Sequence, residues 1–339
     1  MSATGRSAGL DLHSHLEGRV RPATAAELAR RLGAPEPPQG WAAALRLEQP
    51  GDLTAYLACV AASYPLLRDP EAVRRIAYEA VVDAAADGQA HLELRFGQAT
   101  HVSDEHGLDD VIRAAAAGAR DGTAATGVPA GIVIAALRHH DAETNEAVAR
   151  AAARAVGTGV TGFDLAGDES RWPAHAPFAG AFRIAAAAGL GLTCHAAEAA
   201  GPEAVADAVS VLGVRRIGHG AHLAEDPEAL RRAADEGVVI EICPTSNVWT
   251  GAIPDVGAHP AHAFLDAGLR VVLGDDNPVQ TGSLLSAERE VLQHRLGFTP
   301  QQLERLDADA LEAAFLTASE RRQVAAALAC PGEPGHARS

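Results

Sequence analysis

Short apolar runs alternate with longer, alanine-rich stretches along most of this 339-residue chain. The alanine-rich stretches carry the spacing of amphipathic helices, as in Asp69–Asp87, Asn145–Val156, Pro202–Leu212 and Asp226–Glu236. Eight apolar runs have the length and near-continuous hydrophobicity of strands in a covered parallel sheet: Leu10–His15, His91–Phe96, Gly131–Leu137, Val160–Leu165, Gly191–His195, Arg216–His219, Val238–Cys243 and Arg270–Gly274. Eight strand–helix units predict an α/β fold of the (β/α)8 TIM-barrel type rather than an open sheet.

The interval between the first two predicted strands, residues 19–90, is longer than the other intervals. It contains two helical patterns, Ala23–Leu32 and Asp52–Leu67, and a proline- and glycine-rich loop at Gly33–Gly40. Helices inserted at this point can cover the mouth of a barrel. We therefore expect a helical lid after strand one.

Composition narrows the class of protein and of partner. No internal linker interrupts the pattern, so residues 1–330 are expected to form one domain, followed by a disordered tail at 331–339. A formal net charge of -16 repels phosphate groups and disfavours nucleic acid as a partner. No apolar run can span a bilayer, and the first residues lack a signal-peptide pattern. We expect a cytoplasmic protein with no membrane partner.

Polar side chains stand at or just after the ends of the predicted strands. They are His13, His15, Asp164, His195, His219 and Asp276. The C-terminal ends of all strands in a parallel barrel meet on one face, where active sites of such folds are built. These residues, although far apart in sequence, are therefore expected to share one pocket.

Three histidines and one aspartate of this set have the chemistry of a metal site. His13 and His15 are two residues apart on a strand, so both imidazoles project to the same side. His195 and Asp276 complete a set of four ligands that leaves room for a water. All 28 basic residues are arginines, so the carboxylated lysine that usually bridges two metals in such barrels is missing. One metal ion is expected.

Two further residues are candidates for handling protons. A bound metal lowers the pKa of its water toward roughly 7–9, which yields hydroxide near neutral pH. His219 is placed to orient or deprotonate that water. Glu198 is placed to give a proton to the substrate, provided that burial raises its pKa enough to keep it protonated.

Six segments around these residues resemble the signature segments of the adenosine deaminase family, in the amidohydrolase superfamily. They follow the family's order with nearly the family's spacing, from about residue 10 to 290. One such segment is a weak sign, but five or six in order are a strong one. The segments are Asp11–Gly18 (DLHSHLEG), Phe163–Asp168 (FDLAGD), Thr193–Glu198 (TCHAAE), Arg216–Gly220 (RIGHG), Cys243–Ser246 (CPTS) and Asp276–Pro278 (DNP).

The resemblance implies a reaction and a role for each site residue. Hydroxide would add to C6 of a purine and ammonia would leave, with Glu198 protonating N1 and His219 with Asp276 handling the attacking water. The backbone N–H of Gly167 would meet purine N3, and Glu17 would lie near the ribose or whatever group the purine carries. The implied ligands of one Zn²⁺ ion per chain are His13, His15, His195 and Asp276.

The chain departs from the family after strand eight. The family often has Asp-Asp-Pro there, whereas this chain has Asp-Asp-Asn-Pro. Matching Asn277 and Pro278 to the last two positions makes Asp276 the ligand and puts Asn277 in place of the aspartate that bonds purine N7. An asparagine amide donates that hydrogen bond without first needing a proton. The other alignment makes Asp275 the ligand.

Two more departures bear on the substrate. Glu17 is one methylene longer than the aspartate common in adenosine-specific members. The expected lid carries Tyr56, Val60 and Tyr64 where the family often has phenylalanines.

The leading hypothesis is a metal-dependent deaminase of adenosine, deoxyadenosine or a modified adenosine. A second hypothesis keeps the metal but changes the substrate to another amino-heterocycle, such as free adenine or a specialised-metabolite nucleoside, or to a cyclic amide. A third is a family member that only binds nucleoside or acts as a scaffold, although the intact ligand set argues against it. The small zinc deaminases that act on cytosine need a PCxxC segment, which this chain lacks.

The remaining polar residues are given structural roles. Arg95 and Arg138 are expected to make ion pairs under the site, and Asp164 to hold a ligand or a loop. His139 and His140 are expected in a solvated loop. Surface positions are expected for His91, His101, His106, His175, His259, His262 and His294.

Overall fold

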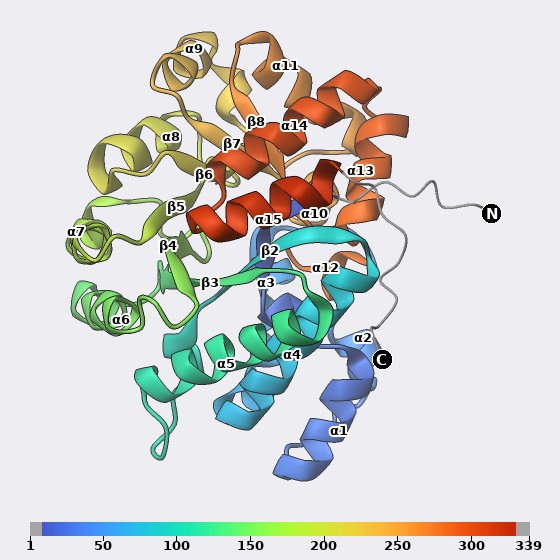
Figure 1. Ribbon diagram of the computed structural model, residues 1–339, viewed down its shortest axis with the longest axis vertical. Coiled ribbons are helices and arrows are strands. Elements are labelled where there is room, and N and C mark those ends of the chain that lie inside the picture. Colours follow the sequence, from blue (N-terminus) through green and yellow to red (C-terminus); the bar gives the residue numbers. More distant parts are fainter. Residues whose placement is uncertain (1–8, 330–339) are drawn as a thin grey trace.

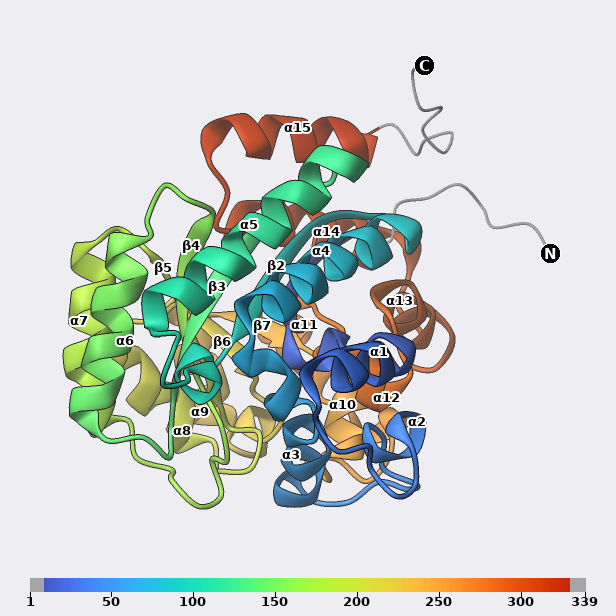
Figure 2. The same cartoon turned by 90° about the horizontal axis from the view of Figure 1, so that it is seen from below.

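Eight parallel strands form one sheet in the computed structural model, which describes residues 9–329. The strands neighbour one another in sequence order, and helices surround them in both views (Figures 1 and 2). The predicted (β/α)8 barrel is thereby confirmed. The strands are β1 (Gly9–His15), β2 (Gln89–Phe96), β3 (Ala130–Leu137), β4 (Val160–Ala166), β5 (Gly191–Ala196), β6 (Arg216–His219), β7 (Val239–Ile242) and β8 (Arg270–Leu273).

The barrel closes between β1 and the residues that follow β8. Ser14 and Asp276 form an isolated parallel bridge. The His15 N–H donates to the Asp276 carbonyl at 2.7 Å, and the Asp276 N–H donates to the His13 carbonyl at 2.8 Å. This seam places two histidines of β1 beside the aspartate of the β8 loop, at the mouth of the barrel.

Most of the helices lie outside the strands and bury apolar faces against them. The helices α4 and α5 pack closely, because Gly118 of α5 has no side chain: a Cβ there would lie 2.1 Å from the Arg74 carbonyl oxygen of α4. These outer helices are α4 (Pro70–Ala86), α5 (Leu108–Thr126), α6 (Ala142–Arg154), α7 (Ala179–Ala187), α8 (Glu203–Asp207), α9 (Pro227–Asp235), α11 (Ala261–Asp266), α13 (Leu285–His294), α14 (Pro300–Ala313) and α15 (Ala318–Ala329).

The long interval after β1 forms a separate group of helices near the barrel mouth. Figure 2 shows α1 (Pro22–Leu32), α2 (Trp41–Ala44) and α3 (Leu53–Ala61) together, next to α10 (Pro244–Trp249) and α12 (Pro278–Thr281). The predicted helix over 52–67 is instead two elements, α3 and a 3₁₀ turn at Tyr64–Arg68. Pro65 lacks the N–H that a continuous helix would need.

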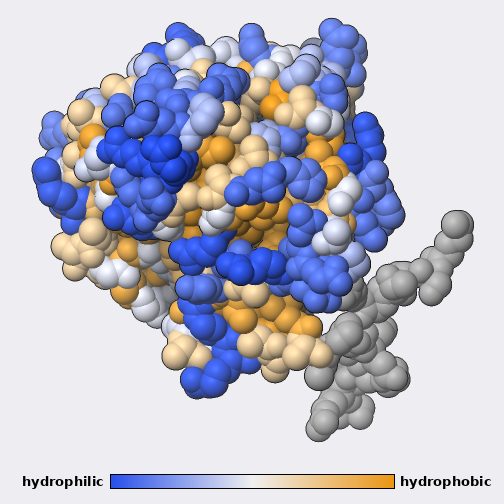
Figure 3. Space-filling view, turned by 90° about the horizontal axis from the view of Figure 1, so that it is seen from above, coloured by the Kyte–Doolittle hydropathy of each residue, from blue (hydrophilic) through white to orange (hydrophobic). Residues whose placement is uncertain are grey.

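The surface of the described part of the chain is mixed. Figure 3 shows hydrophilic residues over much of one face, with apolar residues in patches between them. No helix among residues 9–329 is long and apolar enough to cross a membrane. The predicted tail at 331–339 lies outside the described residues.

Candidate metal and active site

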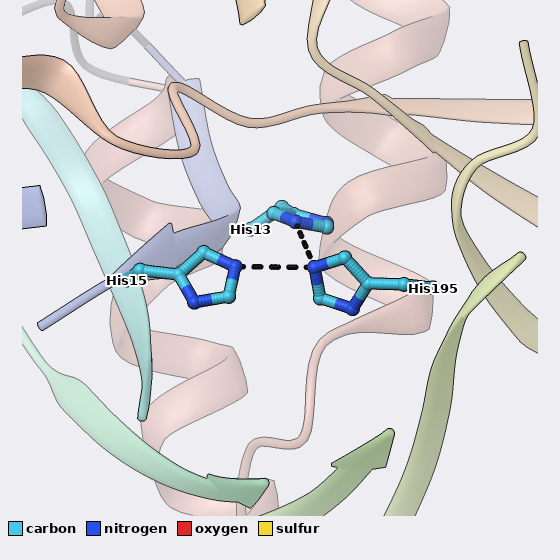
Figure 4. A group of neighbouring side chains, drawn as sticks. All are labelled: His13, His15 and His195. Atoms are coloured by element: carbon cyan, nitrogen blue, oxygen red, sulfur yellow. Dashed lines mark hydrogen bonds between the residues drawn. The ribbon is translucent and has the colours of Figure 1, made fainter. Parts of the chain in front are cut away.

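The side chains of the four predicted ligands meet at one centre. His13 Nε2 and His15 Nε2 each lie 3.1 Å from His195 Nε2. Asp276 Oδ1 lies 3.3 Å from His15 Nε2 and 3.7 Å from His13 Nε2. Figure 4 shows the three rings turned toward one another, His13 and His15 from β1 and His195 from β5. Ligand atoms around a tetrahedral zinc are about 3.3 Å apart, so these separations fit such an ion.

Hydrogen bonds at Nδ1 of His13 and His195 show which ring nitrogen faces the centre. His13 Nδ1 lies 2.7 Å from Glu241 Oε2, and His195 Nδ1 lies 3.1 Å from Asp164 Oδ2. An ionised carboxylate only accepts hydrogen bonds, so each ring carries its proton on Nδ1 and turns the Nε2 lone pair inward. Two lone pairs 3.1 Å apart repel each other unless a cation lies between them. The donor set therefore fits a divalent metal, with carboxylates behind the ligands.

Burial sets the protonation of the histidines. Burial, with the positive charge of Arg95, lowers the pKa of His13 well below its ordinary value, and burial with the neighbouring His195 does the same to the pKa of His15. Burial also lowers the pKa of His195, but the Asp164 carboxylate outweighs it and the net shift is upward. His13 and His15 are thus neutral at pH 7, as metal ligands must be.

The two aspartates after β8 point to opposite sides of the chain. Asp276 adopts a left-handed φ of 60°, and its carboxylate faces His13 and His15. Asp275 instead accepts a hydrogen bond from Arg19 Nη2 at 2.6 Å. Asp276, rather than Asp275, lies within reach of the histidines, which favours the alignment that makes Asp276 the ligand.

Glu198 lies in the turn after β5 and is 5% exposed. Its Oε2 is 3.6 Å from His219 Nε2, and its Oε1 has no hydrogen-bond partner among the described residues. Burial and the charge of Asp276 raise the pKa of Glu198 to about 8. The side chain is therefore an acid at neutral pH, in the form that a proton donor needs.

His219 ends β6 with a φ of 66°, a left-handed conformation that turns its ring into the site. The Asn247 side-chain amide donates to His219 Nδ1 at 3.1 Å. With Nδ1 accepting, the neutral ring carries its proton on Nε2. Burial and the nearby His195 lower the pKa of His219 well below its ordinary value, so the ring is neutral at pH 7 and presents a donor to the pocket.

A cavity of about 310 Å³ opens over this centre. His15, His195, Asp276 and Glu198 line it, together with residues of α3. The three residues expected to bind substrate, Glu17, Gly167 and Asn277, all line the same cavity. Gly167 has a φ of 109°, which a residue with a side chain rarely adopts, so glycine is needed where the backbone borders the cavity.

One oxygen of the Glu17 carboxylate is hydrogen-bonded within the protein, and the other has no partner there. Its Oε1 accepts from the Gly97 N–H at 3.0 Å and from His101 Nε2 at 2.9 Å. Its Oε2 is buried and has no hydrogen-bond partner among the described residues. Glu17 therefore holds one acceptor ready for a donor group that enters the cavity.

Sequence reasoning missed a buried carboxylate under the metal site. Glu241 of β7 bonds His13, accepts from Arg95 Nη2 at 2.8 Å and from Arg216 Nε at 2.7 Å. A single charge inside the apolar run Val238–Cys243 was the available signal, because a buried charge needs a partner. The expected ion pairs of Arg95 are observed, with Asp164 as its other partner at 3.1 Å.

A second missed carboxylate holds the turn that carries Glu198. Glu169 accepts four backbone hydrogen bonds of 2.9–3.1 Å, from the N–H groups of residues 197–200. Arg138 lies 3.5 Å from Glu169 and donates to the His195 carbonyl at 2.8 Å. The pair thus fixes the backbone on both sides of Ala196.

Four of the seven histidines expected at the surface are buried, so this expectation is wrong for them. His101 bonds Glu17, and His175 Nε2 lies 3.1 Å from Arg138 Nη2. In both cases a partner from a distant segment compensates for burial, and the local sequence carries no sign of it. The four are His91, His101, His175 and His259.

Comparison with known proteins shows which family the chain belongs to. The family model for adenosine deaminase matches residues 9–330. A relative from Sinorhizobium medicae, named adenine deaminase, is 35% identical over 324 residues, covering 94% of this chain and 97% of its own. A relative from Enterococcus faecalis, named adenosine deaminase, is 32% identical over 316 residues, covering 92% and 93%.

Solved structures share the fold. An adenine deaminase from Arthrobacter aurescens superposes with a TM-score of 0.87 at 24% identity, covering 95% of this chain and 98% of its own. A zinc-bound amidohydrolase from Burkholderia ambifaria superposes with a TM-score of 0.87 at 28% identity, covering 96% and 90%. Family model, relatives and barrel agree: this chain is a hydrolase of the deaminase type and belongs to the adenosine deaminase family.

Proposed function

We propose that this chain is a zinc-dependent deaminase of a 6-aminopurine nucleoside: adenosine, deoxyadenosine or a modified adenosine. The products are the 6-oxo compound and ammonia. One observation carries the proposal: a buried Glu198 shares a cavity with histidines and an aspartate that converge on one point, where burial raises its pKa to about 8. Attack of hydroxide on a ring carbon is favoured when the adjacent ring nitrogen receives a proton, and Glu198 is the acid for that step.

The remaining residues divide the proton handling among them. The metal ligands in this proposal are His13, His15, His195 and Asp276, and a Zn²⁺ ion held there supplies a water of lowered pKa. His219 Nε2–H donates to the attacking oxygen and orients it. The Asp276 carboxylate accepts the proton of that oxygen and returns it to the departing amine. Glu198 gives its proton to purine N1.

Three residues are proposed to hold the purine. The N–H of Gly167 donates to N3, and the Asn277 amide donates to N7. One Asn277 N–H already donates to Asp276 Oδ1 at 2.7 Å, which leaves its second N–H for the substrate. The free oxygen of Glu17 accepts from the group at the other end of the ring, a ribose hydroxyl or a ring N–H.

Free adenine is the second candidate substrate. The Sinorhizobium medicae relative at 35% identity is named adenine deaminase. The longer side chain of Glu17 brings its carboxylate further into the cavity, where the N9–H of the bare base provides a donor. Structural neighbours named N6-mAMP deaminase, such as one from Arabidopsis with a TM-score of 0.83 at 23% identity, show only that the same barrel supports modified purines.

The first test measures ammonia release from adenine, adenosine and deoxyadenosine, and methylamine release from N6-methyl-AMP. We expect one of them to react with a kcat/KM of at least about 10⁴ M⁻¹s⁻¹. Removal of metal with a chelator should abolish the activity, and added zinc should restore it. Absence of turnover with every aminopurine in the zinc-loaded protein would refute the proposal.

The second test changes Glu198 to Gln, which keeps the shape but removes the acid. We expect kcat to fall roughly 10²–10⁴-fold. Because the pKa of Glu198 is raised to about 8, the acid is present below that pH and is lost above it. The wild-type rate should therefore decline above about pH 8, and the residual rate of the variant should lack this decline. Glu203→Gln, on the exposed side of α8, is the control. Full activity of Glu198→Gln would favour hydrolysis of a cyclic amide instead.

A further inference from the structure

Tyr56 brings a hydroxyl from α3 to the metal centre. Its side chain is 2% exposed, and its Oη lies 3.5 Å from Asp276 Oδ2 and 3.4 Å from Ser246 Oγ. The positions of α3 around it that line the same cavity are mostly apolar: Leu53, Leu57, Ala58, Val60 and Ala61. A hydroxyl in this apolar wall needs a polar partner, and Asp276 with Ser246 provides it.

Counting protons shows what the Tyr56 hydroxyl does. The Ser246 hydroxyl donates its single proton to Asp276 Oδ2. The Tyr56 hydroxyl is a second donor to the same carboxylate oxygen.

The two oxygens of Asp276 then have different surroundings. Oδ1 faces the histidines and accepts from the Asn277 amide at 2.7 Å. Oδ2 faces Ser246 and Tyr56. Donors on both oxygens hold the carboxylate plane at one angle, which keeps Oδ1 in the direction of a metal.

The helix that carries Tyr56 forms a thin wall. One side of α3 borders the active-site cavity, and the other borders a second cavity of about 680 Å³ lined by Ala55, Ala58 and Cys59. Across the mouth, Thr54 Oγ1 donates to Asp168 Oδ2 at 2.7 Å. Hydrogen bonds at Thr54 and Tyr56 thus attach α3 to loops on opposite sides of the site.

We propose that Tyr56 is a positioning residue for Asp276. The Tyr56 hydroxyl on α3 completes the donors around Asp276 Oδ2 and fixes the carboxylate for metal binding and proton transfer. Tyr56 acts through Asp276 and not on the substrate. The kinetic consequence rests on the proposed function, whereas the consequence for metal affinity does not.

The test compares Tyr56→Phe with Tyr64→Phe. Both changes remove one phenol oxygen from the wall of the same cavity, but Tyr64 packs its ring edge against His101, 5.2 Å between centroids, away from Asp276. We measure zinc affinity by competition with a chelator, kcat and KM with the best aminopurine, and the melting temperature. For Tyr56→Phe we expect zinc affinity and kcat to fall about tenfold each, with KM and melting temperature little changed. Tyr64→Phe should match the wild type in zinc affinity.

Three results would overturn the assignment. The first is zinc affinity and kcat of Tyr56→Phe within about twofold of wild type. The second is an equal loss in Tyr64→Phe. The third is a change of Tyr56→Phe that is confined to KM, which would mean that Tyr56 contacts the substrate directly. If no aminopurine is turned over and Tyr56→Phe still binds zinc about tenfold more weakly, the positioning role stands and the proposed function fails.

Discussion

Buried carboxylates in this chain ionise in opposite ways, depending on their neighbours. Burial alone would raise the pKa of Glu241, but the charges of Arg216 and Arg95 outweigh it and hold this pKa well below its ordinary value. Glu288 of α13 has no such cation beside it among residues 9–329. It accepts from the Thr245 N–H at 3.1 Å, yet burial raises its pKa to about 7. Glu241 is therefore a fixed anion, and Glu288 holds a proton over much of the physiological range.

This difference predicts a pH-dependent stability for Glu288. Between pH 4.5 and about 7 the folded chain holds a proton on Glu288 that the unfolded chain has lost, so stability falls as pH rises through this window. Glu288→Gln should remove the effect, and its loss of stability from pH 5 to pH 8 should be about 2 kcal/mol smaller than in wild type. Urea unfolding at both pH values measures this. Glu290→Gln, exposed on the same helix, should behave as wild type, and parallel curves for all three would contradict the prediction.

Individual site residues could be predicted where a histidine or carboxylate stands at the end of a predicted strand. His13, His15, His195 and Asp276 met this condition. Glu241 and Glu169 did not, because their role depends on partners that only the folded chain brings together. Arg95, for example, donates to Glu241 across 146 residues of sequence.

At the scale of elements, the turn after β5 depends on Glu169. The turn contains Ala197 with a φ of 54°, a left-handed conformation that costs an alanine about 1–2 kcal/mol. The Glu169 carboxylate compensates by accepting four backbone N–H groups at once. Glu198 is one of these four residues, so its position is set by a carboxylate from the loop after β4.

Glu169→Gln should therefore impair catalysis as well as stability. A glutamine places an amide N–H₂ against N–H groups of the turn, and about 2–4 kcal/mol of stability should be lost. We expect kcat to fall at least tenfold with a smaller change in KM, because the acid is displaced rather than the cavity. Steady-state kinetics and thermal unfolding of Glu169→Gln measure both effects. The control is Glu143→Gln, at an exposed position of α6. A loss of stability with unchanged kcat would show that the turn keeps its shape without Glu169.

Strand positions were predictable because buried parallel strands are continuous apolar runs. The predicted run over 160–165 and the observed β4 (Val160–Ala166), for example, differ by one residue. The helix expected over 52–67 ends instead at Ala61, because Pro65 lacks the N–H that would continue it, and the apolar positions around Pro65 hid this break in the pattern. Pairing across the β1–β8 seam had no local signal at all.

At the scale of the whole molecule, Arg19 stabilises that seam. Arg19 is 2% exposed and follows β1 directly. It donates to Ser14 Oγ at 2.9 Å, to Asp11 Oδ2 at 3.1 Å and to Asp275 Oδ2 at 2.6 Å. One guanidinium thus joins the first strand to the loop after the last strand, directly behind the residues that are proposed as metal ligands. Burial raises the pKa of both Asp11 and Asp275, and Arg19 opposes this rise.

Arg19→Met should open the seam and make its stability depend on pH. Two buried carboxylates would lose their cation, at a cost of about 3–5 kcal/mol near neutral pH. Their folded-state pKa values would rise further above the ordinary value, so the variant should lose stability as pH rises from about 4 to 7. Urea unfolding at pH 5 and pH 7.5 measures both effects, and Asp11→Asn in the same variant should restore part of the loss. The control is Arg21→Met, two positions further along the chain, which removes an ion pair between the partly exposed side chains of Arg21 and Asp83 that is worth at most about 1 kcal/mol. Equal, pH-independent losses in the two arginine variants would mean that the backbone hydrogen bonds of His15 and Asp276 close the barrel without Arg19.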